Sequence, residues 1–101
     1  MDRLVNILKH EKEIYKTDIP DEYIDPLLMV PIDEPMECPE SRTIVDRVSI
    51  LNHLVYSETD PFTNLRLTKT MLIEHNNLSE VKDRCIEFKN KFNLWKSANR
   101  I

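Results

Sequence analysis

The sequence contains no glycine among its 101 residues. Glycine is needed in phosphate-binding loops and dinucleotide folds, where the backbone approaches an anion, and in the strained turns that present hydrolase nucleophiles. The absence of glycine therefore argues against a large part of the enzyme repertoire. Turns in this chain must be built from proline, aspartate and asparagine instead.

The composition indicates one folded domain with a modest core. Hydrophobic residues make up 41% of the chain and charged residues 32%, which is typical of folded rather than disordered chains. The net charge is −4 and there is no basic cluster, so we expect no nucleic-acid partner. The apolar runs are too short to span a membrane, and the charges within residues 1–15 exclude a secretory signal. We therefore expect no membrane partner either.

The two cysteines and three histidines are widely separated, and no two of them have the spacing of a zinc site. We expect no metal and no cofactor. Two cysteines do not make a disulfide framework, which favours a cytoplasmic or nuclear location. Cys85 lies on an apolar stripe and is expected to be a small buried hydrophobe. Cys38 follows Glu37, whose carboxylate would raise the pKa of the thiol, so we expect no catalytic nucleophile.

The first third of the chain divides into a helix and an extended segment. Apolar residues on one stripe predict a helix at residues 3–16, which we interpret as a packing or linking helix. Residues 18–35 contain four prolines, each of which bars the preceding residue from a helix. This extended segment is also apolar, so it is either tucked under the domain or offered to a partner.

A hairpin and a short helix are predicted next. Residues 36–38 and 43–45 read as its two strands. Asp46 stands where an N-cap belongs, ahead of a helix at residues 47–57. Residues 58–70 are predicted to form a second loop. The apolar face expected for the helix consists of Ile50, Leu51, Leu54 and Val55.

The last helix has the clearest periodicity in the chain. Asn77 and Glu80 resemble a capping box at its start. Apolar residues then recur at steps of three and four, which is the a/d pattern. The first half of this stripe is expected to pack on the domain, and its last two members, Phe92 and Trp95, are expected to meet another chain or further sequence. The stripe consists of Leu78, Val81, Cys85, Phe88, Phe92 and Trp95.

Five short blocks follow one another in a recognisable order. Together they resemble the U-box domain, most closely that of the ubiquitin conjugation factors of the chain-elongating type. The resemblance covers about residues 19–92, with residues 1–18 as an N-terminal helix or linker from a larger protein and 93–101 as a helix end or tail. The blocks are residues 19–27 (Ile-Pro-Asp-Glu-Tyr-Ile-Asp-Pro-Leu), Glu34-Pro35, Asp46-Arg47, His53-Leu54 and Thr59-Asp60-Pro61-Phe62.

The resemblance implies an α+β fold, a small zinc-free RING-like domain. Its parts are two loops, a short β-hairpin, a central helix and a C-terminal helix, beside the N-terminal helix. Hydrogen bonds and salt bridges take the place of the zinc ions in this family. The candidates for fold-stabilising polar pairs are Asp25, Glu34, Asp46 and Arg47.

The resemblance also implies a RING-type E3 ubiquitin transferase. Such a domain binds a ubiquitin-charged conjugating enzyme and promotes transfer of ubiquitin to a lysine of a substrate or of ubiquitin, without a covalent intermediate on the ligase. Ordering a mobile tethered group is catalysis by positioning. The expected partners are a conjugating enzyme, ubiquitin and a protein substrate, and a monomer is favoured over a homodimer. The alternatives are a non-catalytic U-box that serves as a scaffold or dimerisation module, and a small helical adaptor domain.

The family pattern assigns individual site residues. Those expected to contact the conjugating enzyme are Leu27, Met29, Asn52, Tyr56 and Pro61. Many members carry an arginine three residues after the proline of the second loop, where it bridges the conjugating enzyme and the donor ubiquitin. This chain has Asn64 there and Arg66 two residues further on. Either Asn64 positions the donor ubiquitin less strongly than the arginine would, or the side chain of Arg66 positions it instead.

Overall fold

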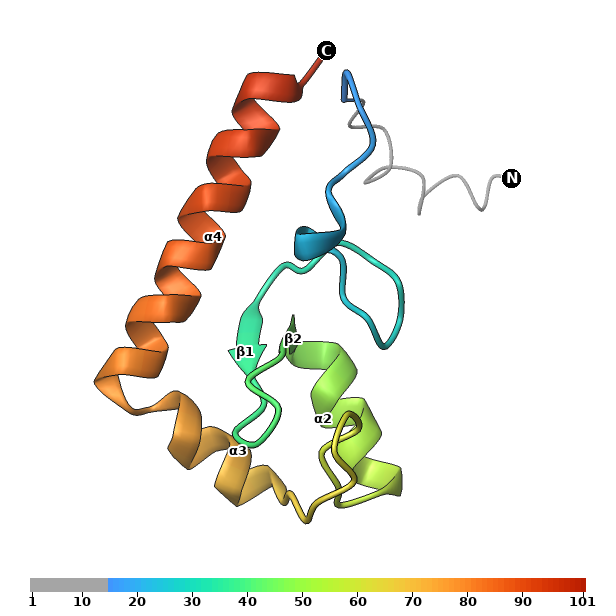
Figure 1. The fold of residues 1–101 in the computed structure, drawn as a ribbon, viewed down its shortest axis with the longest axis vertical. Coiled ribbons are helices and arrows are strands. Elements are labelled where there is room, and N and C mark those ends of the chain that lie inside the picture. The colour runs from blue at the N-terminus through green and yellow to red at the C-terminus, as the bar shows by residue number, and fades with distance from the viewer. Residues whose placement is uncertain (1–14) are drawn as a thin grey trace.

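The computed structural model describes residues 15–101. Figure 1 shows a small α+β domain in which a central hairpin lies between one long helix and one short helix. The elements in chain order are the 3₁₀ helix η1 (Asp21–Tyr23), strands β1 (Pro35–Glu37) and β2 (Ile44–Asp46), and helices α2 (Arg47–Tyr56), α3 (Lys69–Asn76) and α4 (Ser79–Asn99).

The first described residues lie beside the C-terminal end of α4. Tyr15 forms an antiparallel bridge with Arg100, and the amide of Lys16 donates to the carbonyl of Asn99 at 2.7 Å. The rest of the helix predicted at residues 3–16 lies outside the described residues. Its last two residues are not helical, because their backbone pairs with the end of α4.

The predicted hairpin is confirmed, with each strand shifted by one residue. β1 and β2 are antiparallel, with Met36 opposite Val45, and both of these side chains are buried. The ladder includes Pro35, which lies opposite the last residue of β2. Cys38, predicted as a strand residue, instead closes the connecting turn by donating its amide to the carbonyl of Thr43 at 2.9 Å.

Helix α2 packs on the hairpin through Ile50 and Leu54. Leu51 is only partly buried, and Val55 is largely exposed, so the predicted apolar face is too wide. A helix turns by about 100° per residue, which carries Val55 well away from the direction of Ile50. The core cluster consists of Met36, Cys38, Val45, Ile50, Leu54, Leu67 and Leu72.

Helix α3 begins inside the segment predicted as a loop at residues 58–70. The hydroxyl of Thr68 accepts the amide of Met71 at 3.2 Å and caps its first turn. Asn77 ends α3 instead of starting α4, and Leu78 precedes the first turn of α4 without a side-chain cap. The predicted capping box at Asn77 is therefore wrong, because a second helix occupies the residues in front of it.

Helix α4 runs unbroken across residue 92, and its aromatic side chains contact aromatic residues of the same chain. Phe92 is buried and stacks on Tyr23 with ring centroids 4.5 Å apart, and Trp95 lies 5.0 Å from Tyr15. The expectation that Phe92 meets another chain or further sequence is therefore wrong, since Tyr23 covers it. Trp95 is half-buried and contacts Tyr15 of the same chain. No helix within residues 15–101 has the length and apolar character needed to cross a membrane.

Because the chain has no glycine, residues with a Cβ adopt left-handed backbone conformations. Met29, Arg42 and Asn64 have positive φ angles of 58°, 60° and 66°. For residues with a Cβ this left-handed conformation costs roughly 1–2 kcal/mol, and less for asparagine. All three residues lie in turns, where glycine would otherwise be expected.

We predict that Arg42→Gly is more stable than Arg42→Ala by about 1 kcal/mol, because glycine adopts φ near 60° without the steric penalty of a Cβ. Urea unfolding of the two variants checks this, and alanine serves as the control for loss of the arginine side chain. Equal stability of the two variants would contradict a strained turn at this position.

Candidate protein-docking site

The first loop is organised around the carboxylate of Asp25, which is fully buried. Its Oδ2 accepts the amides of Leu27 at 3.2 Å and Leu28 at 2.7 Å. Its Oδ1 accepts the amide of Asp46 at 3.0 Å, at the start of α2. One side chain therefore shapes the loop and ties it to the hairpin and the central helix.

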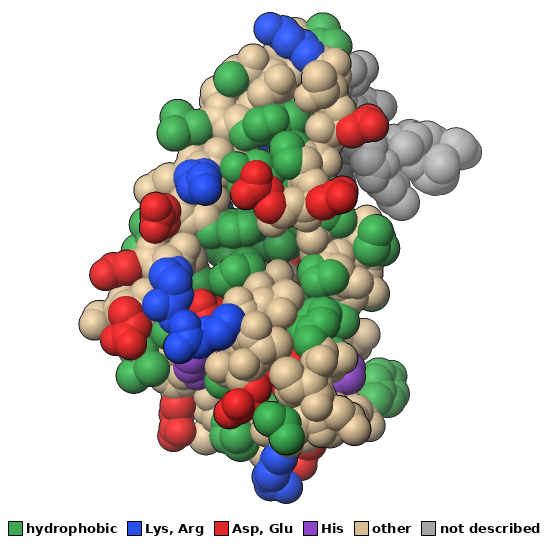
Figure 2. Space-filling view, viewed as in Figure 1, with side chains coloured by type: hydrophobic (Ala, Val, Ile, Leu, Met, Phe, Trp, Pro, Cys, Tyr) green, Lys and Arg blue, Asp and Glu red, His purple; other side chains and the backbone are tan. Residues whose placement is uncertain are grey.

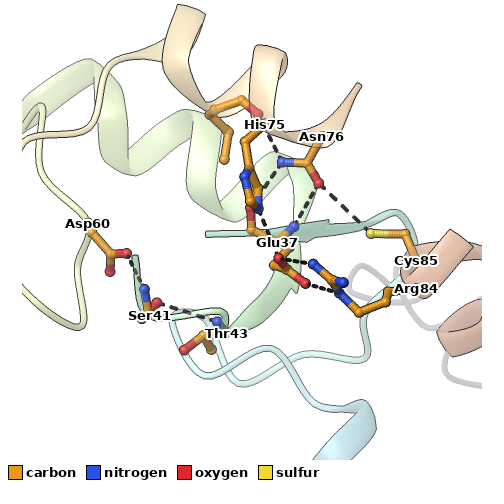
Figure 3. A network of polar contacts seen from close by, with 9 residues as sticks. Glu37, Ser41, Thr43, Asp60, His75, Asn76, Arg84 and Cys85 are labelled. Atoms are coloured by element: carbon orange, nitrogen blue, oxygen red, sulfur yellow. Dashed lines mark hydrogen bonds and ion pairs between the residues drawn. The ribbon is translucent and has the colours of Figure 1, made fainter. Parts of the chain in front are cut away.

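The second loop is organised in the same way around Asp60, which is also fully buried. Its Oδ1 accepts the amide of Phe62 at 2.8 Å, and its Oδ2 accepts the amide of Ser41 at 3.2 Å, in the hairpin turn. Because Ser41 belongs to the connection between β1 and β2, this carboxylate ties the second loop to the opposite end of the hairpin (Figure 3).

The two loops share one backbone pattern. In each, the aspartate precedes a proline, its carbonyl accepts the amide of the residue four positions later, and its amide donates to the carbonyl five positions later at 2.7 Å. The residue at the fourth position has a positive φ in both loops. These equivalent residues are Met29, whose amide donates at 2.8 Å, and Asn64, whose amide donates at 2.7 Å.

The residues predicted to contact a conjugating enzyme differ in how far they are exposed. Met29 is 73% exposed and Tyr56 is 84% exposed. Asn52 is also exposed, whereas Pro61 is half-buried. Leu27 packs against the core cluster and is only partly accessible. The first loop and α2 therefore each present a large side chain that the core does not use. Figure 1 shows that the first loop and α2 lie on the same side of the hairpin.

His53 joins α2 to the second loop. Its Nε2 donates to the carbonyl of Thr59 at 2.9 Å, one residue before the buried aspartate of that loop. The hydroxyls of Ser57 and Thr59 are 2.8 Å apart and share a hydrogen bond. These contacts fix where the second loop starts relative to the end of α2.

Asn64 and Arg66 are both exposed on the second loop. The backbone of Arg66 is bridged to that of Thr59, which closes the loop. Within residues 15–101, neither the Asn64 nor the Arg66 side chain forms a hydrogen bond or an ion pair. Both are therefore available to a partner.

The candidate polar pairs act mainly through backbone amides. Asp46 is buried, and its Oδ1 accepts the amides of Asp33 at 2.8 Å and Glu34 at 2.9 Å, so it does not form the side-chain cap predicted for α2. Glu34 and Arg47 are 4.0 Å apart, and both side chains are substantially exposed. An exposed pair of this kind contributes little to stability.

A family model of the U-box domain matches residues 19–100. The chain belongs to the U-box family. The expected α+β fold is also confirmed: the U-box has its hairpin, its central helix α2 and its C-terminal helix α4. Within residues 15–101, no group of His, Cys, Asp or Glu could hold a metal ion.

The similar proteins are ubiquitin conjugation factors. Ubiquitin conjugation factor E4 A of Mus musculus is 35% identical over 77 residues, which is 76% of this chain and 7% of that protein. Probable ubiquitin conjugation factor E4 of Arabidopsis thaliana is 43% identical over 56 residues, 55% of this chain and 5% of that protein. E4 ubiquitin-protein ligase UFD2 of Saccharomyces cerevisiae is 37% identical over 57 residues, 56% of this chain and 6% of that protein. The chain thus spans a small fraction of the relatives it matches.

Sequence reasoning missed the main ion pair of this U-box. The Glu37 side chain is 3% exposed, and its two oxygens accept Nε and Nη2 of Arg84, each at 2.8 Å (Figure 3). Nε2 of His75 donates to the same carboxylate at 2.9 Å. The hydrogen bond from Arg84 lowers the pKa of Glu37, against the opposing effect of burial. One carboxylate therefore connects β1 to α3 and α4.

Asn76 completes the outer edge of β1. Its Oδ1 accepts the amide of Glu37 at 2.9 Å, and its Nδ2 donates to the carbonyl of the same residue at 3.0 Å. Nδ2 also donates to the carbonyl of Leu72 at 2.9 Å, which fixes the side chain against α3. The amide group therefore makes the contacts that a neighbouring strand would make, and it satisfies backbone groups that an edge strand leaves open.

Neither cysteine is poised to act as a nucleophile. Cys38 is fully buried, and burial raises the pKa of its thiol to about 12, with a smaller contribution from the charge of Asp60. The direction agrees with the sequence prediction, but the main cause is burial and not the adjacent Glu37. Cys85 is half-buried, not fully buried as expected, and burial raises its pKa too. A thiol without thiolate character is a poor nucleophile.

We predict that Glu37→Gln lowers the free energy of unfolding by about 2 kcal/mol at pH 7, because the buried ion pair with Arg84 is lost. The folded pKa of Glu37 lies below its ordinary value of about 4.3, so its stabilisation is present above that pH and is lost as pH falls through the folded pKa. Urea unfolding between pH 7 and pH 3 is the measurement. Wild type should lose more stability below about pH 4 than the variant, and parallel curves would contradict this role.

Proposed function

We propose that this U-box binds a ubiquitin-charged conjugating enzyme and promotes transfer of ubiquitin to a lysine of a protein substrate or of ubiquitin. The observation that carries the proposal is the pair of equivalent loops, each fixed by a buried aspartate, beside a helix with an exposed aromatic side chain. The relatives support it by name, since one is called a ubiquitin-protein ligase and others ubiquitin conjugation factors.

The docking surface that we propose combines Met29 of the first loop, Asn52 and Tyr56 of α2, and Pro61 of the second loop. Large apolar and aromatic side chains within a polar rim are typical hot spots of protein interfaces. The loops are already held in place by Asp25 and by its counterpart in the second loop. Little backbone order then has to be gained on binding, which favours affinity.

The chemical step that we propose is transfer of ubiquitin from the thioester of the conjugating enzyme directly to a lysine amine. The U-box contributes by ordering the enzyme and its tethered ubiquitin, which lowers the entropic part of the barrier. A covalent step on the U-box is disfavoured by the high pKa of Cys38. Catalysis therefore requires docking and positioning but no reactive group of this chain.

Positioning of the donor ubiquitin falls to the tip of the second loop. Asn64 has a left-handed conformation that asparagine adopts readily. Its side chain can donate and accept hydrogen bonds, but it is short and uncharged, whereas arginine offers five donors on a long side chain. We propose that this U-box activates transfer less strongly than a variant with arginine at the same position.

The alternative function, a scaffold or dimerisation module, depended on an exposed apolar stripe at the end of α4. Phe92 is buried against Tyr23, and Trp95 is half-buried beside Tyr15, so contacts within the chain already use much of this stripe. We therefore propose a monomeric U-box that acts through its docking loops.

We predict that Met29→Asp reduces discharge of ubiquitin from a cognate conjugating enzyme to free lysine at least tenfold, because it places a charge at the centre of an apolar contact. The assay contains activating enzyme, a panel of conjugating enzymes, ubiquitin and ATP. Leu94→Asp is the matched control, since Leu94 on α4 is 70% exposed and Met29 is 73% exposed. The control should retain wild-type activity.

If the wild-type domain stimulates ubiquitin discharge from none of the conjugating enzymes in the panel, the ligase proposal is overturned. Equal activity of Met29→Asp and wild type would overturn the docking surface.

We predict that Asn64→Arg raises the rate of ubiquitin discharge several-fold, because a guanidinium can bridge two proteins where the short amide cannot. Single-turnover discharge at saturating U-box separates this effect from tighter binding. If Asn64→Arg has no effect and Arg66→Ala abolishes discharge, Arg66 positions the donor ubiquitin instead.

A further inference from the structure

A pocket of about 380 Å³ lies between α4, the hairpin and η1. Figure 2 shows it as a hollow with hydrophobic side chains at its floor, beside a group of basic side chains on α4 and the hairpin turn. None of the residues proposed to dock the conjugating enzyme lines it. Its volume is within the range of pockets that bind small ligands or single side chains of a peptide.

The floor of the pocket is apolar and preformed. Tyr23 comes from η1, Ile44 from β2 and Phe88 from α4. The rings of Tyr23 and Phe88 are in edge-to-face contact, with centroids 5.6 Å apart. Because three separate elements meet here, the floor is held by the fold and suits an aliphatic or aromatic side chain of a ligand.

Three cations surround this floor. Arg84 is fixed by Glu37 through Nε and Nη2, which leaves Nη1 unused by that ion pair. Arg42 stands in the hairpin turn with its left-handed backbone, and Lys91 follows on α4. Among residues 15–101, the side chains of Arg42 and Lys91 form no ion pair or hydrogen bond. Of the three cations, Arg84 is thus paired with Glu37, whereas Arg42 and Lys91 have no direct partner within residues 15–101.

Besides Glu37, two further carboxylates line the pocket and are unpaired within residues 15–101, namely those of Glu22 and Glu87. They would repel a phosphate or another polyanion. They suit a ligand that carries a single carboxylate for the cations and N–H donors for the acids. A peptide has this combination, because each residue contributes a backbone N–H.

We infer that this pocket binds an extended peptide segment of the protein substrate, in which an acidic side chain stands next to an aliphatic or aromatic one. The carboxylate contacts Arg42 and Lys91, and the apolar side chain rests on Ile44 and Phe88. The inference rests on the proposed ligase function and names its substrate class.

Binding is tested with fluorescein-labelled, capped hexapeptides in anisotropy titrations. The parent peptide is Gly-Ser-Asp-Leu-Ser-Gly, and the comparisons replace its Asp by Asn or its Leu by Ala. We expect each replacement to weaken binding at least fivefold. Arg42→Glu combined with Lys91→Glu should weaken binding of the parent at least tenfold, because both contacts to the carboxylate become repulsive.

The matched control combines Lys82→Glu with Lys89→Glu, two exposed lysines of α4 that do not line the pocket, and it should bind as wild type does. Thermal unfolding of both double variants checks that the fold is kept. Equal affinity for all three peptides, equal binding by wild type and the Arg42/Lys91 variant, or competition by inorganic phosphate alone would overturn the inference.

A functional arm separates this inference from the ligase proposal. Ubiquitin discharge to free lysine needs no substrate segment, so the Arg42/Lys91 variant should discharge at the wild-type rate. Ubiquitination of a carrier protein with the parent hexapeptide beside a lysine should fall at least fivefold in that variant. If the wild-type domain does not discharge ubiquitin to free lysine, the ligase proposal is wrong. If the Arg42/Lys91 variant ubiquitinates the carrier protein as fast as wild type does, the peptide site is wrong.

Discussion

Carboxylates that are buried against backbone amides are the interaction on which this fold depends. Both oxygens of Asp25 and both oxygens of Asp60 accept main-chain N–H groups. A buried charge without such partners would be strongly unfavourable, whereas hydrogen bonds to an ionised acceptor are about twice as strong as neutral ones. One oxygen of each aspartate organises its own loop, and the other reaches a distant element, Asp46 in one case and Ser41 in the other. Each loop is thereby cross-linked to one end of the hairpin.

A buried carboxylate also joins helices α3 and α4 to the hairpin. Glu37 sits at the end of β1 and receives His75 from α3 and Arg84 from α4, while Asn76 pairs with its main chain. Two helices are thus joined to one strand residue by polar contacts that add to the packing of a small core. The orientation of α4 in turn sets where its aromatic side chains meet Tyr23.

The features that could be predicted are those with local causes. Proline and aspartate mark both loops at Asp25 and Asp60, because these residues have few alternatives to a turn when glycine is absent. Helix α3 could not be predicted, since Leu72 is its one buried side chain and the apolar run at residues 71–73 shows no helical period. The partners of Glu37 lie 38 and 47 residues away, so no spacing in the sequence connects them. Of the candidate site, the two loops were anticipated from the sequence. Asp25 was assigned to a side-chain pair and Asp60 only to a turn, whereas both carboxylates accept backbone amides.

The pairing of residues 15–16 with residues 99–100 has a mechanical consequence. Tension applied between these two backbone segments acts first on their few hydrogen bonds and on the contact between Tyr15 and Trp95. Such an antiparallel contact opens like a zipper, one bond after another, so the force does not reach the hairpin until the contact has peeled apart. The paired segments would therefore separate before the end of the domain that carries the two loops, and the loops would keep their shape under such tension.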